Sequence, residues 1–144
     1  MFLGEHEHTI DDKGRLTLPA KLRAPFAGGI VLSRGLDKCV HAHTPERWRN
    51  LREERLAAID PFSSAGRQMQ RYVFSGASES TVDRQGRVPI PGPLAKYAGL
   101  GKDVVVAGVD DHLEIWDRAA WRRQSEEFEG SAEDVAERIS TARQ

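Results

Sequence analysis

The chain has 144 residues, 30% of them charged, and its 21 Lys and Arg against 22 Asp and Glu give a formal net charge of −1. Apolar residues are spread along the whole length, without a membrane-length run or a secretory pattern at the N-terminus, so we expect neither a disordered nor a membrane protein. The single Cys excludes an internal disulfide and indicates a reducing, cytoplasmic setting. A near-neutral charge argues against a nucleic-acid binder unless the charges are segregated.

The start of the chain recurs 72 positions later, which predicts a duplicated unit of about 70 residues. A unit this small buries too little apolar surface to be stable alone, so we expect the two copies to share one core. Nine residues are identical between the copies: Phe2, Gly4, Glu7, Thr9, Asp11, Gly14, Arg15, Pro19 and Leu22 correspond to Phe74, Gly76, Glu79, Thr81, Asp83, Gly86, Arg87, Pro91 and Leu94.

The first copy predicts a β-hairpin, a short helix, two further strands and a longer helix. Residues 7–11 alternate polar and apolar side chains, and residues 15–18 resume the alternation after a turn at Gly14, where positive φ favours glycine. Pro19 ends that strand, and residues 20–24 form a short helix. The remaining predicted elements are strands at residues 30–33 and 39–43 and a helix with Thr44 as N-cap and Pro45 at its first position.

The second copy repeats this series, with a turn at Gly86, a helix over residues 93–97, strands at 104–107 and 112–116, and a helix capped by Asp117. Between the copies, a Pro, Ser and Gly-rich segment leads into a predicted helix over residues 67–72. After residue 125, six acidic residues stand against two basic ones, so we expect an exposed, partly ordered tail. The predicted organisation is a first unit 1–59, a linker and helix 60–72, a second unit 73–125, and an acidic C-terminal tail 126–144.

Each hairpin turn has an Asp and an Arg four residues apart, Asp11 with Arg15 and Asp83 with Arg87. Across a tight hairpin the two side chains can pair bidentately, which fixes the direction of the guanidinium. Two cations at the tips, Lys13 and Arg84, are placed to meet phosphate. The alternative is a pair of solvated turns whose Asp–Arg pairs only close the hairpins.

The sequence predicts no catalytic or metal site. His6 and His8 alternate on one strand, as do His41 and His43 on another, so each pair could face one side and bind a metal. Neither pair has a nearby third or fourth ligand of known geometry, so we expect no metal site. Cys39 fits a small buried side chain. Because nucleophile-elbow, Walker, dinucleotide and zinc-protease motifs are all absent from the sequence, we expect no enzyme activity, no cofactor and no small-molecule substrate.

Three stretches, MFLGEHEHTIDDKGRLTLPAKLR, ASESTVDRQGRVPIP and YAGLGKDVVVAGVDDHLEIWD, closely resemble the MraZ family of bacterial transcriptional regulators. The resemblance covers residues 1–125 and implies an α+β, mostly β fold related to AbrB proteins. In that fold two tandem swapped-hairpin units form one pseudo-symmetric β-barrel with flanking helices.

The resemblance also implies a sequence-specific DNA-binding repressor of the division and cell-wall gene cluster, cytoplasmic and associated with the nucleoid. Such proteins bind tandem promoter repeats, including those of their own operon, as ring-shaped homo-oligomers. Carried over by position, the resemblance assigns DNA contact to Arg15 and Arg87 with Lys13 and Arg84 beside them, orientation of the arginines to Asp11 and Asp83, and the turns to Gly14 and Gly86.

Two alternatives stay open on the residues alone. One is a protein-interaction module, such as an AbrB-like antitoxin or scaffold, and the other is a phosphoanion-binding enzyme that uses the Asp–Arg pairs. The copies also differ: Gln85 stands where the first has Lys13, and Pro89 where it has Thr17, which indicates an edge strand. Residues 1–125 hold 19 basic and 16 acidic side chains, so the near-zero total charge hides a basic body and an acidic tail.

Overall fold

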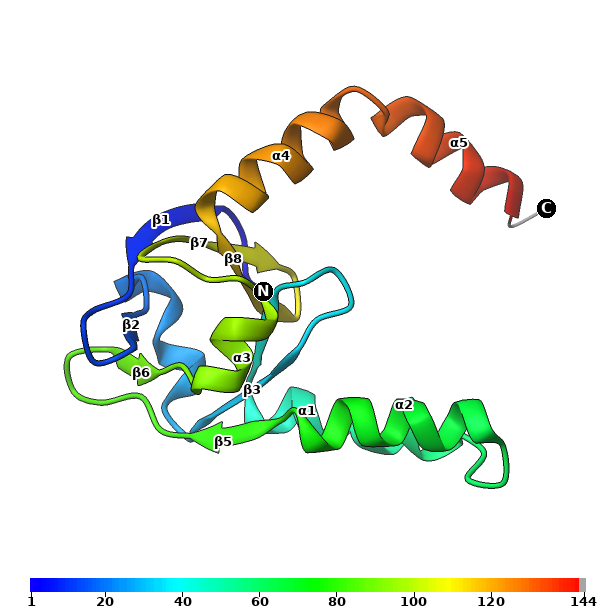
Figure 1. The fold of residues 1–144 in the computed structure, drawn as a ribbon, viewed down its shortest axis with the longest axis horizontal. Coiled ribbons are helices and arrows are strands. Elements are labelled where there is room, and N and C mark those ends of the chain that lie inside the picture. Colours follow the sequence, from blue (N-terminus) through cyan, green and yellow to red (C-terminus); the bar gives the residue numbers. More distant parts are fainter. Residues whose placement is uncertain (143–144) are drawn as a thin grey trace.

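Each half of the chain contains a strand, a glycine turn and a second strand in the computed structural model, which describes residues 1–142 (Figure 1). The first half contains β1 (Glu5–Thr9), β2 (Arg15–Thr17), the 3₁₀ helices η1 (Ala20–Leu22) and η2 (Ala24–Phe26), β3 (Ile30–Arg34), β4 (Val40–His43), α1 (Pro45–Glu54) and η3 (Leu56–Ala58). The second contains α2 (Ser64–Ser75), β5 (Ser78–Ser80), β6 (Arg87–Pro89), α3 (Gly92–Tyr97), β7 (Asp103–Val109), β8 (His112–Asp117), α4 (Arg118–Glu129) and α5 (Ala132–Ala142).

The two halves exchange strands. The main sheet has the order β1-β7-β8-β4-β3-β5, and all of its pairs are antiparallel. The first strand of each half therefore joins the other half, since β1 pairs with β7 and β5 pairs with β3. The short strands β2 and β6 pair with each other in a separate two-stranded sheet. Neither half has a complete sheet without the other.

An approximate twofold axis relates the halves. In the small sheet Leu16 lies opposite Val88, its equivalent 72 residues later. In the main sheet the central pair is β4 with β8, where His41 lies opposite Glu114. Each of these pairs joins equivalent strands of the two copies, so the repeat in the sequence corresponds to a twofold symmetry of the fold.

The hydrophobic core lies between the main sheet and the β2–β6 pair, as the shared-core prediction requires. Leu16, Leu18 and Val88 from the hairpins are fully buried there, together with Leu32 and Val106 from the main sheet. Because these residues come from both halves, a single core serves the whole repeat.

The α+β class and the antiparallel sheet are confirmed, but the closed barrel is not shown. Within residues 1–142 the strands form an open six-stranded sheet and a separate two-stranded sheet, not one closed sheet. Pro89 lies on β6, whose only partner strand in the described chain is β2, so its missing N–H costs no interior ladder bond, as the edge-strand prediction expected.

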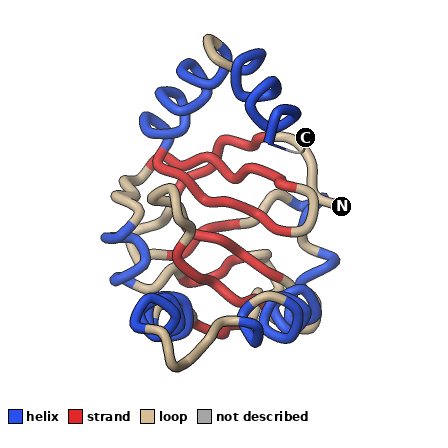
Figure 2. The backbone as a smooth tube through the Cα atoms, turned by 90° about the vertical axis from the view of Figure 1, so that its right-hand side faces the viewer, coloured by secondary structure: helices blue, strands red, loops and turns tan. Residues whose placement is uncertain are grey.

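In Figure 2 longer helices lie above and below the strands, and shorter helical segments lie beside them. The predicted N-caps are both present: Thr44 Oγ1 accepts from the Arg47 N–H at 3.1 Å before α1, and Asp117 accepts from the Ala120 N–H before α4. No helix within residues 1–142 is long and apolar enough to cross a lipid bilayer.

The segment after residue 125 differs from the partly ordered tail that we expected. The helix α4 continues to Glu129, and α5 then covers Ala132–Ala142, extending away from the sheet (Figure 1). No residue of α5 is buried. Its acidic first turn, with Glu133 and Asp134, suits a helix N-terminus, which the charge count of the segment alone did not reveal.

Candidate nucleic-acid interface

The first hairpin tip is organised around the carboxylate of Asp11. Its Oδ1 accepts hydrogen bonds from the backbone N–H groups of Lys13 and Arg15, both at 2.9 Å, which closes the turn. Its Oδ2 accepts from Arg15 Nε at 2.8 Å. Gly14 has a φ of +75°, which a side-chain-bearing residue rarely adopts. One carboxylate thus holds both the backbone of the turn and the direction of the arginine.

The second tip repeats this geometry almost atom for atom. Asp83 Oδ1 accepts from the N–H groups of Gln85 and Arg87, at 2.9 and 2.8 Å, and Oδ2 accepts from Arg87 Nε at 2.7 Å. Gly86 has a φ of +81°. The Asp–Arg pairing that the sequence predicts is therefore present in both copies.

The mode of pairing differs from the expected bidentate fork. Each arginine donates to its aspartate through Nε, and the second carboxylate oxygen is used by the backbone instead. Within residues 1–142, no hydrogen bond ties the two terminal guanidinium nitrogens of Arg15 or Arg87. These nitrogens are the pair with which an arginine contacts a guanine edge or a phosphate.

The same hydrogen bonds act on the carboxylates. The backbone N–H of Arg15 is the largest influence on Asp11 and lowers its pKa below the ordinary value. Desolvation opposes this shift, and the hydrogen bond from the Arg15 side chain adds to it. The backbone N–H and then the side chain of Arg87 lower the pKa of Asp83 in the same way. Both aspartates therefore remain charged, and hold their arginines, throughout the neutral range.

Backbone hydrogen bonds connect the two tips. Gly14 C=O accepts from the Ile90 N–H at 2.9 Å, and Gly86 C=O accepts from the Leu18 N–H at 2.8 Å, so each turn is bonded to the strand end of the other hairpin. Together with the β2–β6 pair, these bonds fix both tips at one end of the molecule, on the left in Figure 1. Lys13 and Arg84 are exposed on these tips, as predicted.

One cation at this end escaped the sequence analysis. Arg23 donates from Nε to the Leu18 C=O at 2.9 Å, and its guanidinium covers the Gly86 turn, since a Cβ built on Gly86 would lie 2.1 Å from Arg23 Nε. The second copy has Ala95 at the equivalent position, so the repeat gave no signal for it. The tip surface is therefore unequal in charge across the twofold axis.

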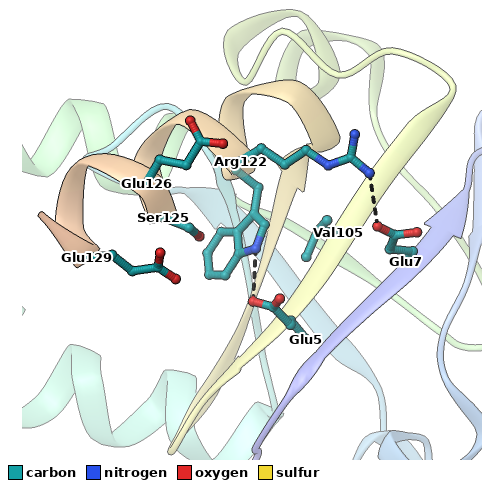
Figure 3. Close-up of a pocket in the computed structure, with 8 residues that line it drawn as sticks. Glu5, Glu7, Val105, Arg122, Ser125, Glu126 and Glu129 are labelled. Carbon is teal, nitrogen blue, oxygen red and sulfur yellow. Dashed lines mark hydrogen bonds and ion pairs between the residues drawn. The ribbon is translucent and has the colours of Figure 1, made fainter.

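A pocket under α4 is lined mainly by acidic side chains, in contrast to the cations of the hairpin tips (Figure 3). Trp121 Nε1 donates to Glu5 at 3.0 Å and Arg122 donates to Glu7 at 3.3 Å, which docks α4 on β1. The four carboxylates that line it outnumber its single arginine: Glu5, Glu7, Glu126 and Glu129 surround Arg122. Such a lining repels phosphate, which makes this pocket a poor candidate for a nucleic-acid site.

Comparison with known proteins agrees with the tandem arrangement. A family model described as "MraZ protein, putative antitoxin-like" matches this chain twice, over residues 1–71 and 73–142. The chain belongs to the MraZ family. The transcriptional regulator MraZ of Heliobacterium modesticaldum is 45% identical over 140 residues, covering 96% of each protein. The MraZ match extends to residue 142, beyond the end at residue 125 that the sequence motifs indicated, so α4 and α5 lie within the family's own domain.

Proposed function

We propose that this chain is a sequence-specific DNA-binding transcriptional regulator whose two hairpin tips contact double-stranded DNA. The observation that carries the proposal is the duplicated Asp–Arg unit, in which Arg15 and Arg87 are held by Nε at 2.8 and 2.7 Å with their terminal nitrogens directed by the hairpin. An arginine held in this way loses little side-chain freedom on binding, and its terminal nitrogens match the acceptors of guanine.

Different side chains of the tips contact the DNA bases and the DNA backbone. Arg15 and Arg87 read base edges in the major groove, while the exposed Lys13 and Arg84 hold phosphates. The supporting residues Asp11 and Asp83 orient the arginines. The name of the Heliobacterium relative, a transcriptional regulator, supports the same class of function.

The small charge of each tip indicates that several must act together. The first tip carries two acidic and two basic residues, and the second carries one acidic and two basic residues. A few phosphate contacts give weak binding at cellular salt, and a rigid assembly of tips multiplies them. We therefore propose a ring homo-oligomer, in the cytoplasm and at the nucleoid, that binds tandem promoter repeats, including its own operon in the division and cell-wall cluster, and represses transcription.

The test is a binding titration on a duplex with the tandem repeats found upstream of its own gene. Arg15→Ala and Arg87→Ala should each weaken binding by about 1–3 kcal/mol. Lys13→Ala should reduce the salt slope, the steepness with which the logarithm of the binding constant falls with the logarithm of salt concentration, by about one. Arg52→Ala is the matched control, since Arg52 is an exposed arginine on α1 rather than on a hairpin tip, and it should bind as the parent does.

Two outcomes would overturn parts of the proposal. If both tip variants bind like the parent, with the same salt slope, the tips are not the interface, and a protein-interaction module such as an antitoxin or scaffold becomes the better interpretation. Light scattering that shows only a monomer at micromolar concentration would remove the ring while leaving the tip contacts testable.

A further inference from the structure

The strands at the centre of the main sheet bring Glu114 of the second half beside Cys39 and His41 of the first half. His41 on β4 and Glu114 on β8 are directly opposite each other in the antiparallel pair. Cys39 lies directly before β4, two residues ahead of His41. Metal-ligating atoms of these three residues all lie within 4.8 Å of one another.

Their spacing matches a tetrahedral zinc site. His41 Nε2 is 3.3 Å from Glu114 Oε2. Zinc bonds of about 2.0–2.2 Å to nitrogen and oxygen, at tetrahedral angles, place two such ligand atoms about 3.3–3.5 Å apart. The histidine and the carboxylate are thus already at the separation that a shared ion requires. The cysteine sulfur lies within 4.8 Å of both atoms and has to move closer to them to complete the set.

A glycine leaves room beside these ligand atoms. A Cβ built on Gly35 would lie 2.6 Å from Cys39 Sγ and 2.7 Å from His41 Nε2. Any side chain at position 35 would therefore occupy the space in front of both atoms. Gly35 is held there by its backbone, since its N–H donates to the Cys39 C=O at 2.8 Å and its C=O accepts from the hydroxyl of Tyr97.

Outer groups hold Glu114 in place. Trp116 Nε1 donates to Glu114 Oε1 at 2.9 Å, and His112 Nε2 lies 3.2 Å from Oε2. The other ring nitrogen of His112 lies 2.7 Å from Asp111 Oδ1, which fixes the ring. Metal ligands in proteins are oriented by outer hydrogen bonds of this kind.

We propose that Cys39, His41 and Glu114 bind one Zn²⁺ ion, with water at the fourth position, and that the ion joins the two halves of the chain. The mixed sulfur, nitrogen and oxygen donor set suits Zn²⁺ better than Mg²⁺ or Ca²⁺. Cys39 Sγ loses its proton to solvent on binding, and His41 keeps its proton on Nδ1. The thiolate and the carboxylate then balance the two charges of the ion, so the partly buried site is neutral.

The site is independent of the proposed DNA contacts, because its ligands lie on β4, on β8 and in the turn before β4, not on the hairpin tips. The partly exposed side chains of His41 and Glu114, at 24% and 17%, give the ion a path from solvent, whereas Cys39 is fully buried. By crossing the central β4–β8 pair, the ion would stabilise the contact between the halves.

The test is a Co²⁺ titration of the full chain after removal of bound metal with a chelator. The expected result is one Co²⁺ per chain, with a thiolate-to-cobalt charge-transfer band and the strong visible absorption of four-coordinate Co²⁺. Cys39→Ala should remove the charge-transfer band, and His41→Gln and Glu114→Gln should weaken binding at least tenfold. His8→Gln, which removes an imidazole from β1, is the matched control and should titrate like the parent.

A second readout is thermal unfolding with and without Zn²⁺. Saturating Zn²⁺ should raise the Tm of the parent by several degrees and leave that of Glu114→Gln unchanged. If Cys39→Ala does not fold, as circular dichroism would show, the partly exposed His41→Gln decides the question. A folded parent without the charge-transfer band, or an unchanged titration in His41→Gln, overturns the proposal.

Discussion

At the scale of single residues, the aspartates of the hairpin tips do two things with one carboxylate. Asp11 and Asp83 each close a turn through Oδ1 and direct an arginine through Oδ2. An Asn at either position could accept from the backbone but could not hold the arginine by charge. The aspartate therefore matters for the direction of the arginine as much as for the shape of the turn.

The pKa of Asp11 provides a direct test of this double role. A carboxyl NMR titration should place the pKa of Asp11 and of Asp83 below the ordinary 3.8. In Arg15→Ala the pKa of Asp11 should rise only part of the way back, because the backbone N–H of residue 15, the larger cause of the shift, still donates. The pKa of Asp83 in the same variant is the internal control and should not move.

The sign of the stability effect follows from the direction of the shift. A carboxyl whose pKa is lower in the folded state stabilises that state above its unfolded pKa, and the stabilisation is lost as the pH falls through the lowered value. The Asp–Arg units should therefore stay formed at pH 5 and open only in stronger acid. A pKa of Asp11 at or above 3.8 would contradict the hydrogen-bond pattern described for the tip.

Much of the tip was predictable from residue spacing, and part of it was not. An Asp and an Arg four residues apart across a glycine turn must lie close together, so the pairing was expected. Which guanidinium nitrogen is used depends on the arginine rotamer, which spacing does not determine. Arg23 was missed because it reaches the Gly86 turn from the other hairpin's following segment, a contact made only by the tertiary fold.

At the scale of elements, the two hairpins look equivalent in backbone but not in surroundings. Gly14 and Gly86 share nearly the same φ, +75° and +81°. The space around them differs. Among residues 1–142, a Cβ at Gly14 would meet only the Ile90 C=O, at 3.8 Å, whereas one at Gly86 would collide with Arg23. The same substitution therefore has different costs in the two copies.

We expect Gly14→Ala to lower the free energy of unfolding by about 1–2 kcal/mol, the cost of a left-handed conformation for an L-residue. Gly86→Ala should cost more, because Arg23 must move and give up its hydrogen bond to the Leu18 C=O. Urea unfolding of both variants measures the difference.

The double variant Gly86→Ala with Arg23→Ala is the control for the collision. Relative to Arg23→Ala alone, the glycine substitution should then cost no more than Gly14→Ala does. Equal costs for the two single variants would show that Arg23 adapts freely and is not held over the turn.

The elements themselves were largely predictable, but their partners were not. Alternating side chains and cap residues such as Thr44 and Asp117 located the strands and helix starts within a few residues. The period of two identifies a strand without identifying the strand that it pairs with, so the approach of His41 to Glu114 became visible only in the folded sheet. For the same reason, residue spacing alone did not show that Glu114 lies beside Cys39 and His41.

At the scale of the whole molecule, strand exchange makes the two halves interdependent. β1 completes the sheet of the second half, β5 completes that of the first, and both halves contribute to one core. Separating the halves would expose core residues such as Leu16 and Val88, which have no exposed surface in the intact chain. A half on its own should therefore not form a stable monomer.

Expression of residues 1–61 and 62–144 as separate fragments, divided in the loop before α2, tests this expectation. Each fragment alone, at concentrations where it is monomeric, should lack a cooperative thermal transition, and an equimolar mixture should regain one together with the native circular dichroism spectrum. The intact chain unfolded and refolded in parallel is the control. A cooperative transition in either monomeric fragment would show that the exchange of strands is not needed for folding.

Carrying both hairpins on one chain has a consequence for how the molecule can diverge. A homodimer of single units repeats every substitution twice, whereas here one copy can change while the other stays as it was. Gln85 in place of Lys13, Arg84 in place of Asp12, and Ala95 in place of Arg23 are such one-sided differences. Because of these differences the two tips present different side chains. A duplex that lies across both tips would therefore make different contacts in its two possible orientations.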